Sequence, residues 1–308
     1  MTDASLLISV PGDTLRNALG TPPEGAEVVV WNMQTPPPAA HLDIVVPPYM
    51  NTAPLLSALT GVTTRLVQSQ SIGYDDVPAA LPPGHVFANA ATVHETSTAE
   101  LTLALVLAAQ RGLPDFVRAA SEGRWAPARH ASLADRRVLL VGYGGVGRAI
   151  EDRLAPFEVE LARVASRARD DERGRIHGID ELPRLLPDAE IVIVGVPLNA
   201  STTGLVDAAF LAALPDGALV VNIARGRVAD TDAMLAEAAS GRLRFALDVT
   251  DPEPLPEGHP LFALPNVLIS PHLGGASTAM MPRMARLLRR QIERMLRGDE
   301  PLNVVLRT

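Results

Sequence analysis

Short apolar runs alternate with segments of helical periodicity along most of the chain. The runs are rich in Val, Ile and Leu and are bounded by Gly, Pro or polar residues, which is typical of strands buried in a parallel sheet. In the first third of the chain they predict strands at Leu6–Val10, Val28–Trp31, Ile44–Val46 and Arg65–Gln68. Farther along they predict strands at Val138–Val141, Val159–Ala165, Ile191–Val196, Ala218–Asn222, Leu243–Asp248 and Val267–Ser270. The alternation indicates an α/β protein, and the six later strands match the number in a complete dinucleotide-binding domain.

Two segments have a clear helical pattern. Residues 97–100, Ser-Thr-Ala-Glu, have the spacing of a capping box and precede Leu101–Arg111, which is apolar on nearly every side. We therefore expect a buried helix between domains or at a subunit interface, and we interpret Glu100 as its cap rather than as a catalyst. The last predicted helix, Ala276–Gly298, has one apolar face and one face rich in arginine, which we interpret as solvated.

Composition excludes several kinds of chemistry. All 27 basic residues are Arg, and the chain has no Lys and no Cys. Schiff bases, pyridoxal phosphate, the P-loop lysine, thiol nucleophiles and thiolate metal sites are therefore impossible, and we expect no metal. The net charge of -8 gives no general attraction to nucleic acid or to anionic lipid. No signal peptide or membrane-spanning run is evident, so we expect a soluble cytoplasmic protein.

A glycine-rich segment, LLVGYGGVG, follows the first strand of the second group. Gly142, Gly144 and Gly147 have G-x-G-x-x-G spacing and lie directly before a predicted helix, Val146–Leu154. In a dinucleotide-binding turn, the first Gly turns the chain, the second admits the pyrophosphate, and the third packs helix on strand. A tight turn without a ligand is the alternative, and the strands on either side favour the dinucleotide.

The next strand ends without the acid that usually binds the ribose of NAD. Residues 166–169 read Ser-Arg-Ala-Arg instead. A carboxylate would repel a 2′-phosphate, whereas a hydroxyl and guanidinium groups would bind it, so the sequence favours NADP(H). A merely solvated loop is the alternative and leaves NAD(H) possible. Arg173 and Arg175, farther along what we expect to be the same loop, are weaker candidates.

Three late strands run into polar segments. In doubly wound sheets, ligands bind beyond the carboxyl ends of the strands. The segments NIARGRVAD, ALDVTDPEP and NVLISPHLGG resemble the signatures of the D-isomer-specific 2-hydroxyacid dehydrogenases, and VGVPLNASTTGLV, SIGYDDV and HETSTAELTLALVLAAQR extend the resemblance over most of the chain. RLAPFEV followed by SR is similar to the NADPH-preferring glyoxylate and hydroxypyruvate reductases of that family.

The resemblance implies two doubly wound parallel-sheet domains. Residues 97–278 would form a Rossmann-type dinucleotide-binding domain, and residues 1–96 with 279–308 a flavodoxin-like substrate domain. It also implies a homodimer formed through the region of residues 101–137.

The resemblance makes Arg225, Glu253 and His272 the catalytic trio, and their chemistry agrees. Arg225 can bind the carboxylate of a 2-oxo acid through its planar fork. His272 can donate a proton to the carbonyl oxygen as hydride arrives, and Glu253 would stabilise the charged imidazole. A surface ion pair, a loop histidine and an exposed acid are the alternatives for the three residues taken singly.

The resemblance also assigns binding roles. Asp248 would accept the nicotinamide amide, the backbone of Ser71, Ile72 and Gly73 would bind the substrate carboxylate, and Tyr49 would cover the substrate side chain. The complete set of cofactor-binding candidates is Gly142, Tyr143, Gly144, Gly145, Val146, Gly147, Ser166, Arg167, Arg169, Val196, Pro197, Ala224, Asp248 and Gly274. The substrate-binding candidates are Ser71, Ile72, Gly73, Tyr49, Arg225 and His272.

The sequence therefore predicts NADPH-dependent reduction of a small 2-oxo acid, such as glyoxylate or hydroxypyruvate, to the D-2-hydroxy acid. An NAD(P)H-sensing protein without turnover, like the corepressors that share this fold, is one alternative. Another is a different dehydrogenase on the same scaffold. A formate enzyme would need another polar pair in place of Glu253 and His272, whereas phosphite oxidation stays open.

Overall fold

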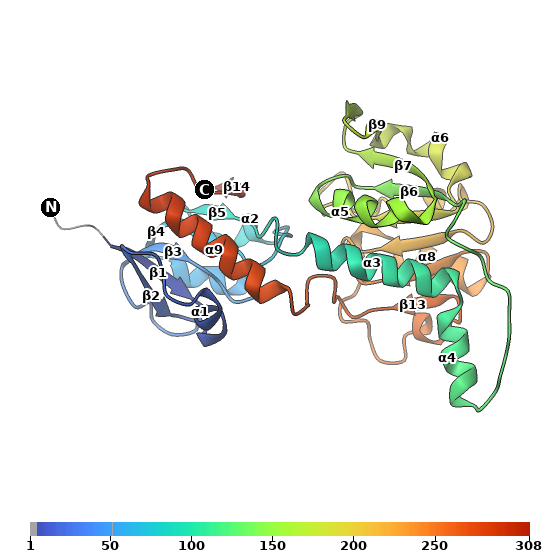
Figure 1. The fold of residues 1–308 in the computed structure, drawn as a ribbon, viewed down its shortest axis with the longest axis horizontal. Coiled ribbons are helices and arrows are strands. Elements are labelled where there is room, and N and C mark those ends of the chain that lie inside the picture. Colours follow the sequence, from blue (N-terminus) through green and yellow to red (C-terminus); the bar gives the residue numbers. More distant parts are fainter. Residues whose placement is uncertain (1–4, 51) are drawn as a thin grey trace. The chain divides into compact units, whose positions relative to one another are not determined.

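The structure is a computed structural model that describes residues 5–50 and 52–308. The chain divides into two compact units: Met1–His94 with Ser277–Thr308, and Glu95–Ala276. Each unit is built on a largely parallel sheet (Figure 1). This arrangement confirms the predicted α/β class with two parallel sheets.

The first unit has a six-stranded sheet in the order β14-β5-β4-β3-β1-β2. Five strands are parallel in the flavodoxin-like order, and β14 pairs antiparallel with β5. The strands are β1 (Leu6–Val10), β2 (Ala26–Val30), β3 (His41–Val45), β4 (Thr63–Gln68), β5 (Val86–Ala88) and β14 (Val304–Arg307). The four predicted strands are confirmed, whereas the short strands β5 and β14 were not predicted.

Helical segments cover both faces of this first sheet. Helices α1 (Asp13–Leu19) and α9 (Met280–Leu296) pack on one face, and η1 (Ala53–Leu59) and α2 (Val77–Ala80) on the other. Helix α9 begins at Met280, later than predicted, and its predicted apolar face is buried: Met284, Leu287, Leu288, Ile292 and Met295.

The second unit has an eight-stranded sheet in the order β13-β12-β11-β10-β6-β7-β9-β8. Its strands are β6 (Arg137–Val141), β7 (Glu160–Ala165), β8 (Arg169–Asp171), β9 (Gly174–Gly178), β10 (Ile191–Val194), β11 (Leu219–Asn222), β12 (Arg244–Leu247) and β13 (Val267–Ile269). All six predicted strands are present, but the count of six was wrong because the hairpin β8–β9 adds two. These strands gave no clear signal, since β8 is wholly polar and β9 contributes one large apolar side chain, Ile176.

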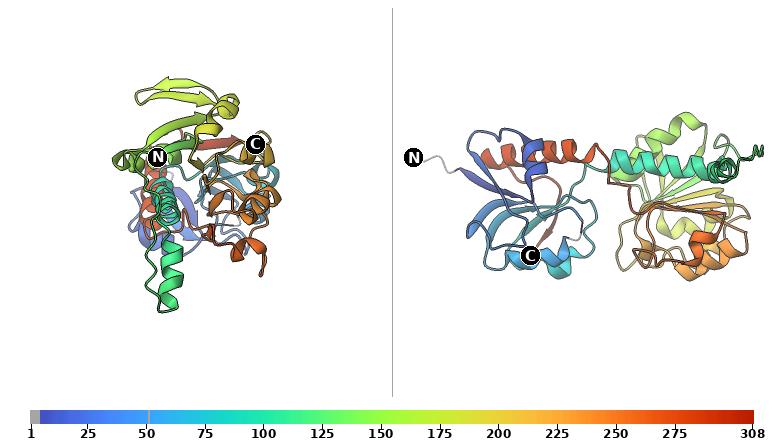
Figure 2. Two further views of the ribbon diagram at one scale, coloured as in Figure 1. Left: turned by 90° about the vertical axis from the view of Figure 1, so that its right-hand side faces the viewer. Right: turned by 90° about the horizontal axis from the view of Figure 1, so that it is seen from below.

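Two layers of helices enclose this second sheet. Helices α3 (Glu95–Gln110) and α5 (Gly145–Leu154) pack on the face that carries Leu140, and α7 (Ala208–Ala212) and α8 (Thr231–Ala239) on the face that carries Val141. The other helical segments are α4 (Leu113–Ser121), η2 (Ala155–Phe157), η3 (Ile179–Glu181), α6 (Leu182–Leu185), η4 (Leu186–Asp188), η5 (Gly226–Val228) and η6 (Pro260–Ala263). Within its unit, α4 extends away from the sheet (Figures 1 and 2).

Helix α3 corrects one prediction. It is largely buried, as expected, but it begins at Glu95 rather than at Leu101, so Ser97 lies inside the helix and not at its N-cap. Glu100 is exposed and lies 3.8 Å from the guanidinium of Arg153, an ion pair between α3 and α5. The helix therefore begins six residues before the position that the capping-box spacing indicated. No helix in the described parts of the chain is long and apolar enough to cross a membrane.

Candidate active site

The glycine-rich turn joins β6 to α5 in the second unit. Gly142 has a φ of 110°, and a Cβ there would lie 2.5 Å from the carbonyl of Gly195, so only glycine fits. A Cβ on Gly147 would lie 2.3 Å from the oxygen of Gly142, because the helix packs directly on the turn. The two glycines thus have the structural duties that the motif assigns to its first and third positions.

Gly144 differs from the other two. A Cβ built on it would meet nothing within 4 Å, and its φ of -99° is open to any residue. It is the N-cap of α5, whose first N–H groups, including those of Gly145 and Val146, have no acceptor inside the helix. Open space beside a helix N-terminus fits a pyrophosphate, and the residues present therefore suit a dinucleotide.

The end of β7 lies beside this turn. The N–H of Gly142 donates to the oxygen of Val164 at 2.9 Å, which places Ser166 and Arg167 at the same edge of the sheet. Both side chains are exposed. Arg169 Nη2 donates to the carbonyl oxygen of Tyr143 at 3.3 Å, so this guanidinium lies against the turn itself.

Arg173 and Arg175 do not belong to the loop that contains Ser166. Arg173 lies at the turn of the β8–β9 hairpin and Arg175 lies in β9. Arg173 pairs with Asp152 at 2.6 Å, and Arg175 contacts Glu181 at 3.5 Å. The expectation of one continuous loop was therefore wrong, because the chain folds back as a hairpin directly after Ala168.

A buried carboxylate connects the turn, the helix and the hairpin. Glu151 of α5 accepts hydrogen bonds from the Tyr143 hydroxyl, from Arg163 of β7 (Nε, 2.7 Å) and from Arg173 (Nη1, 3.2 Å). Burial opposes ionisation of Glu151, but these donors prevail and lower its pKa. Burial, followed by the bond to Glu151, raises the pKa of Tyr143. The pair is therefore a phenol donating to an ionised carboxylate.

Arg225 follows β11 at a turn that the buried side chain of Asn222 fixes. Asn222 accepts the N–H of Ala224 at 3.0 Å and donates to the oxygen of Arg225 at 3.1 Å. Arg225 is half-buried, and its Nη1 donates to the Ala224 oxygen at 2.9 Å. A Cβ on the next residue, Gly226, would lie 1.8 Å from the oxygen of Thr250, so the Arg225 turn packs backbone to backbone on the segment after β12.

That segment carries Glu253, which meets His272 beyond β13. His272 Nδ1 lies 2.5 Å from Glu253 Oε1, and both side chains are about one-third exposed (34% and 38%). The contact orients the imidazole and turns Nε2, on the opposite side of the ring, away from the carboxylate. The structure thus brings together Glu253 and His272, and the Gly226 contact joins them to the Arg225 turn.

The loop that holds His272 is anchored by Asp248. The buried Asp248 carboxylate accepts from Ser270 Oγ (2.8 Å) and from the N–H groups of Leu273 (2.8 Å) and Gly274 (2.9 Å). The His272 N–H donates to the Asp248 backbone oxygen at 2.8 Å, with a left-handed φ of 56°. Binding of the nicotinamide amide by Asp248 stays a prediction, and its contacts show that it also shapes this loop.

The remaining cofactor candidates lie at neighbouring strand ends. Val196 is buried just after β10, close to Gly142, and Pro197 beside it is exposed. Ala224 is buried in the turn before Arg225. Gly274 packs against Asp248 and Thr98, where a Cβ would come within 3.4 Å of three side-chain atoms.

The substrate loop lies in the first unit, after β4. The Ser71 N–H donates a hydrogen bond to Ser69 Oγ at 2.9 Å, so this N–H already has an acceptor within the loop. Asn89 Nδ2 holds the oxygen of Ile72 at 3.0 Å, which fixes the peptide before Gly73. Of the three predicted donors, Ile72 and Gly73 are the better placed.

Tyr49 is connected to this loop through His94. The two rings stack with centroids 5.7 Å apart and an interplanar angle of 20°. His94 Nε2 lies 2.6 Å from the oxygen of Gln70, the residue before the loop. Tyr49 is thus fixed beside residues 71–73, and its role toward a substrate stays a prediction.

Comparison with known proteins agrees with this geometry. A family model described as D-isomer specific 2-hydroxyacid dehydrogenase, NAD binding domain, matches residues 103–274, more than half of the chain. The chain belongs to the D-isomer specific 2-hydroxyacid dehydrogenase family. It is therefore an oxidoreductase with a domain for a nicotinamide cofactor.

Similar proteins include curated relatives and solved structures. Glyoxylate reductase of Thermofilum pendens is 31% identical over 248 residues, covering 77% of this chain and 73% of the relative. Glyoxylate reductase/hydroxypyruvate reductase of Homo sapiens is 30% identical over 291 residues, covering 89% of each. The D-isomer specific 2-hydroxyacid dehydrogenase of Xanthobacter autotrophicus Py2, solved with NADPH and MES, is 29% identical with a TM-score of 0.82 over 98% of each chain.

Several residues position this dehydrogenase site in a way that the sequence did not indicate. Ser270 and Glu151 bond to partners 22 and 12 residues away, Asp248 and Arg163. Asn222 bonds within its own turn, to Ala224 and Arg225. Gly226 was visible as a glycine next to Arg225, but only the structure shows that it contacts Thr250. These residues position Arg225, His272 and the glycine-rich turn, which the motifs did indicate.

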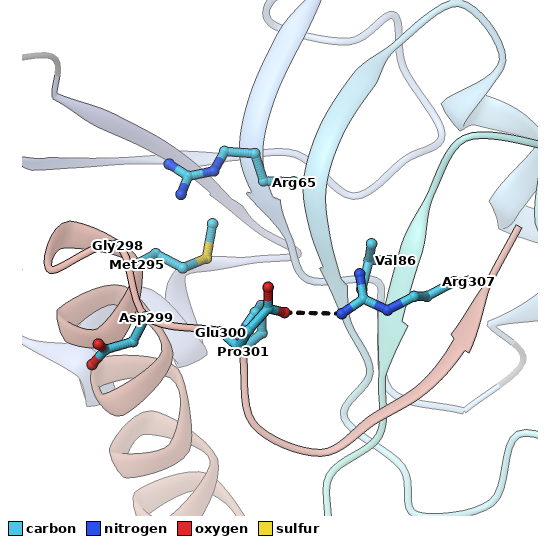
Figure 3. A pocket seen from close by; sticks show the side chains of 8 residues that line it. All are labelled: Arg65, Val86, Met295, Gly298, Asp299, Glu300, Pro301 and Arg307. Carbon is cyan, nitrogen blue, oxygen red and sulfur yellow. Dashed lines mark hydrogen bonds and ion pairs between the residues drawn. The ribbon is translucent and has the colours of Figure 1, made fainter.

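A separate cavity of about 190 Å³ lies in the first unit (Figure 3). Its basic side chains are already paired with acids, Arg307 with Glu300 at 2.9 Å and Arg65 with Asp43 at 3.4 Å. It lies near the amino ends of β4 and β5, whereas ligands of doubly wound sheets bind at carboxyl ends. The described residues contain no cluster of His, Asp and Glu suited to a metal ion.

Proposed function

We propose that this dehydrogenase uses NADPH to reduce a small 2-oxo acid, of the size of glyoxylate or hydroxypyruvate, to the D-2-hydroxy acid. The observation that carries the proposal is the 2.5 Å contact of His272 Nδ1 with Glu253, on a segment packed against the Arg225 turn. In such an arrangement, Arg225 can supply the cation that binds a substrate carboxylate, and His272, oriented by Glu253, can supply the proton.

The protein's part of the reaction is to bind the substrate and move one proton. Arg225 would hold the 2-oxo acid by charge-assisted hydrogen bonds. His272, protonated and held by Glu253, would donate the Nε2 proton to the carbonyl oxygen, which becomes the hydroxyl. The nicotinamide, when bound, supplies the hydride that reaches the carbonyl carbon. In the reverse direction, neutral His272 would accept the hydroxyl proton.

The cofactor would be bound at the edge of the second sheet. The N-terminus of α5 would hold the pyrophosphate, with Gly144 leaving the space for it. Ser166 and Arg167 would bind the 2′-phosphate, and Arg169 would support the turn through Tyr143. The Xanthobacter relative was solved with NADPH, which supports the same preference here.

The backbone of residues 71–73, in the first unit, is a second candidate for binding a substrate carboxylate. We assign the N–H groups of Ile72 and Gly73 to this task, since the Ser71 N–H is bonded to Ser69. Tyr49 would limit the size of the substrate side chain. The two relatives named as glyoxylate or hydroxypyruvate reductases support a small 2-oxo acid.

We also propose a homodimer formed through the region around α4. This region exposes large apolar side chains, with Trp125 94%, Val117 69% and Leu113 49% exposed. Clustered exposed apolar side chains of this kind mark interaction surfaces. Light scattering should give twice the chain mass of 32.6 kDa, and the variant Val117→Asp should reduce it to the mass of one chain.

The decisive experiment compares NADPH with NADH oxidation by the purified protein, using glyoxylate, hydroxypyruvate, pyruvate and a bulky aryl 2-oxo acid. We expect turnover of the small substrates with a clear preference for NADPH. In the variant Arg167→Gln, KM for NADPH should rise about tenfold while KM for NADH stays unchanged, since only the 2′-phosphate contact is lost. Tight binding of NADPH without turnover would instead indicate a sensor. An equal response to both cofactors would refute the NADPH assignment.

A further inference from the structure

Glu151 and its three hydrogen-bond partners form a group that we define as the Glu151 cluster: Tyr143, Glu151, Arg163 and Arg173. Glu151 is the only acid within it, and its side chain is 10% exposed. Its partners come from the glycine-rich turn, from β7 and from the β8–β9 hairpin. One carboxylate therefore connects three segments that are separate in the sequence.

Further contacts strengthen this connection. Arg148 of α5 pairs with Asp171 of β8 at 3.3 Å, and Arg163 Nη1 donates to the Arg173 oxygen at 2.8 Å. The guanidinium carbons of Arg148 and Arg163 each lie 5.7 Å from the Tyr143 ring centre. The hairpin is thus held against α5 at both its strand and its turn.

The segment Ser166–Ala168 lies between two fixed points. It leaves β7 at Ala165 and enters β8 at Arg169, whose side chain holds the Tyr143 carbonyl. Because the cluster fixes both strands, the short exposed segment between them has few conformations left. Binding a phosphate there then requires less ordering of the arginine side chains.

We propose that Glu151 is a positioning residue for NADPH selectivity, holding the Ser166–Arg169 segment in the form that binds a 2′-phosphate. This inference rests on the proposed NADPH preference. Glu151 does not touch the phosphate in this account. The negative charge of Glu151 by itself weakens the binding of a nearby phosphate. In this proposal Glu151 strengthens phosphate binding only by fixing the shape of the segment, and this effect outweighs the repulsion.

The two effects of Glu151 predict opposite results when its charge is removed. Glu151→Gln removes a negative charge, so an account based on charge alone predicts tighter binding of a 2′-phosphate. The positioning account predicts weaker binding, because Gln cannot accept from all three partners. Tyr143→Phe changes no charge, so the charge account predicts no effect, whereas the positioning account again predicts weaker binding.

The measurement is calorimetric binding of adenosine 2′,5′-bisphosphate and of AMP to the full-length protein. These ligands differ only in the 2′-phosphate. We expect both variants to bind the bisphosphate about tenfold more weakly and AMP almost unchanged, as expected when two arginine side chains must be ordered on binding. Glu237→Gln is the matched control: Glu237 also pairs with an arginine, Arg242 at 2.6 Å, near the C-terminal end of α8.

Each outcome has a defined meaning. Thermal unfolding establishes that each variant is folded, and Tyr143→Phe carries the test if Glu151→Gln is not. Unchanged or tighter bisphosphate binding by the folded variants would overturn the positioning role while leaving the NADPH preference intact. Equal affinity of the wild-type protein for bisphosphate and AMP would overturn both the preference and this inference.

Discussion

Gly226 offers a direct test of how the candidate site is assembled. A Cβ at this position would lie 1.8 Å from the oxygen, 2.2 Å from the carbon of Thr250 and 2.7 Å from the nitrogen of Asp251. All three are backbone atoms, which cannot rotate away as a flexible side chain would. In the variant Gly226→Ala, the Arg225 turn and the segment leading to Glu253 must therefore separate by about 1 Å or more.

The expected cost follows from that displacement. Overpacking of this kind lowers the free energy of unfolding by about 1 to 3 kcal/mol, which corresponds to a fall in Tm of roughly 3 to 10 °C for a unit of this size. A 1 Å misplacement of catalytic groups costs on the order of a hundredfold in rate. We expect kcat for 2-oxo acid reduction to fall by about that factor, since Arg225 and Glu253 lie on opposite sides of the contact.

The assay combines thermal unfolding with steady-state kinetics. Affinity for adenosine 2′,5′-bisphosphate should be nearly unchanged, because the glycine-rich turn and Ser166 are not part of the contact. Gly12→Ala is the control for a glycine substitution as such, since its Cβ would meet nothing within 4 Å and its backbone is extended. A Gly226→Ala protein with wild-type kcat and Tm would refute the claim that this contact aligns Arg225 with Glu253.

Three further predictions test other parts of the site. Gly144→Ala should leave Tm unchanged, because its Cβ has open space, while KM for the cofactor rises about tenfold or more, since that space is meant for the pyrophosphate; a large loss of Tm would contradict this. Glu253→Gln should lower kcat by about a hundredfold with a smaller change in substrate KM, because His272 loses its orienting carboxylate; a kinetic profile equal to that of wild type would argue against the pair. The bond from the Gly178 N–H, followed by those from His177 and Arg184, lowers the pKa of Glu181 to about 2 in the folded protein. Because the pKa of Glu181 is lower in the folded protein, ionised Glu181 stabilises the fold fully above pH 4.5, and this stabilisation is lost as pH falls toward 2. The difference in Tm between wild type and Glu181→Gln should therefore narrow as pH falls from 4.5 to 2, and a widening difference would contradict this.

The strands could be predicted because burial on both faces leaves a local signal. β10 and the first three residues of β11 are fully buried runs of Ile, Val and Leu, and each strand was found to within two residues. The hairpin β8–β9 has no such signal, since exposed arginines and acids hold it by ion pairs with α5. Those partners are distant in the sequence, so no periodicity within residues 169–178 indicates the hairpin.

The same division applies to the candidate site. Arg225, Glu253 and His272 could be found because each directly follows an apolar strand and lies in a motif. The residues that align them act through contacts across the sheet edge, and their sequence neighbours do not indicate the partner. Asp248 is an example: it was predicted as a nicotinamide acceptor, and the structure shows in addition that both its oxygens hold residues 270–274.

The contacts between neighbouring strand ends form a continuous series in the second unit. Gly142 bonds to β7 through Val164 and packs on Gly195 after β10. The N–H of Ile223 donates to Val194 at 3.0 Å, Gly226 packs on Thr250, and Asp248 holds Gly274. Each neighbouring pair of strands in the order β7-β6-β10-β11-β12-β13 is thus joined at or just beyond its carboxyl end. Because a parallel sheet fixes the strands but not the loops, the contacts of Gly226 and Asp248 hold the loops of the candidate site in place. Substitutions at Gly226 or Asp248 should therefore affect the site as much as loss of Glu253, which orients His272.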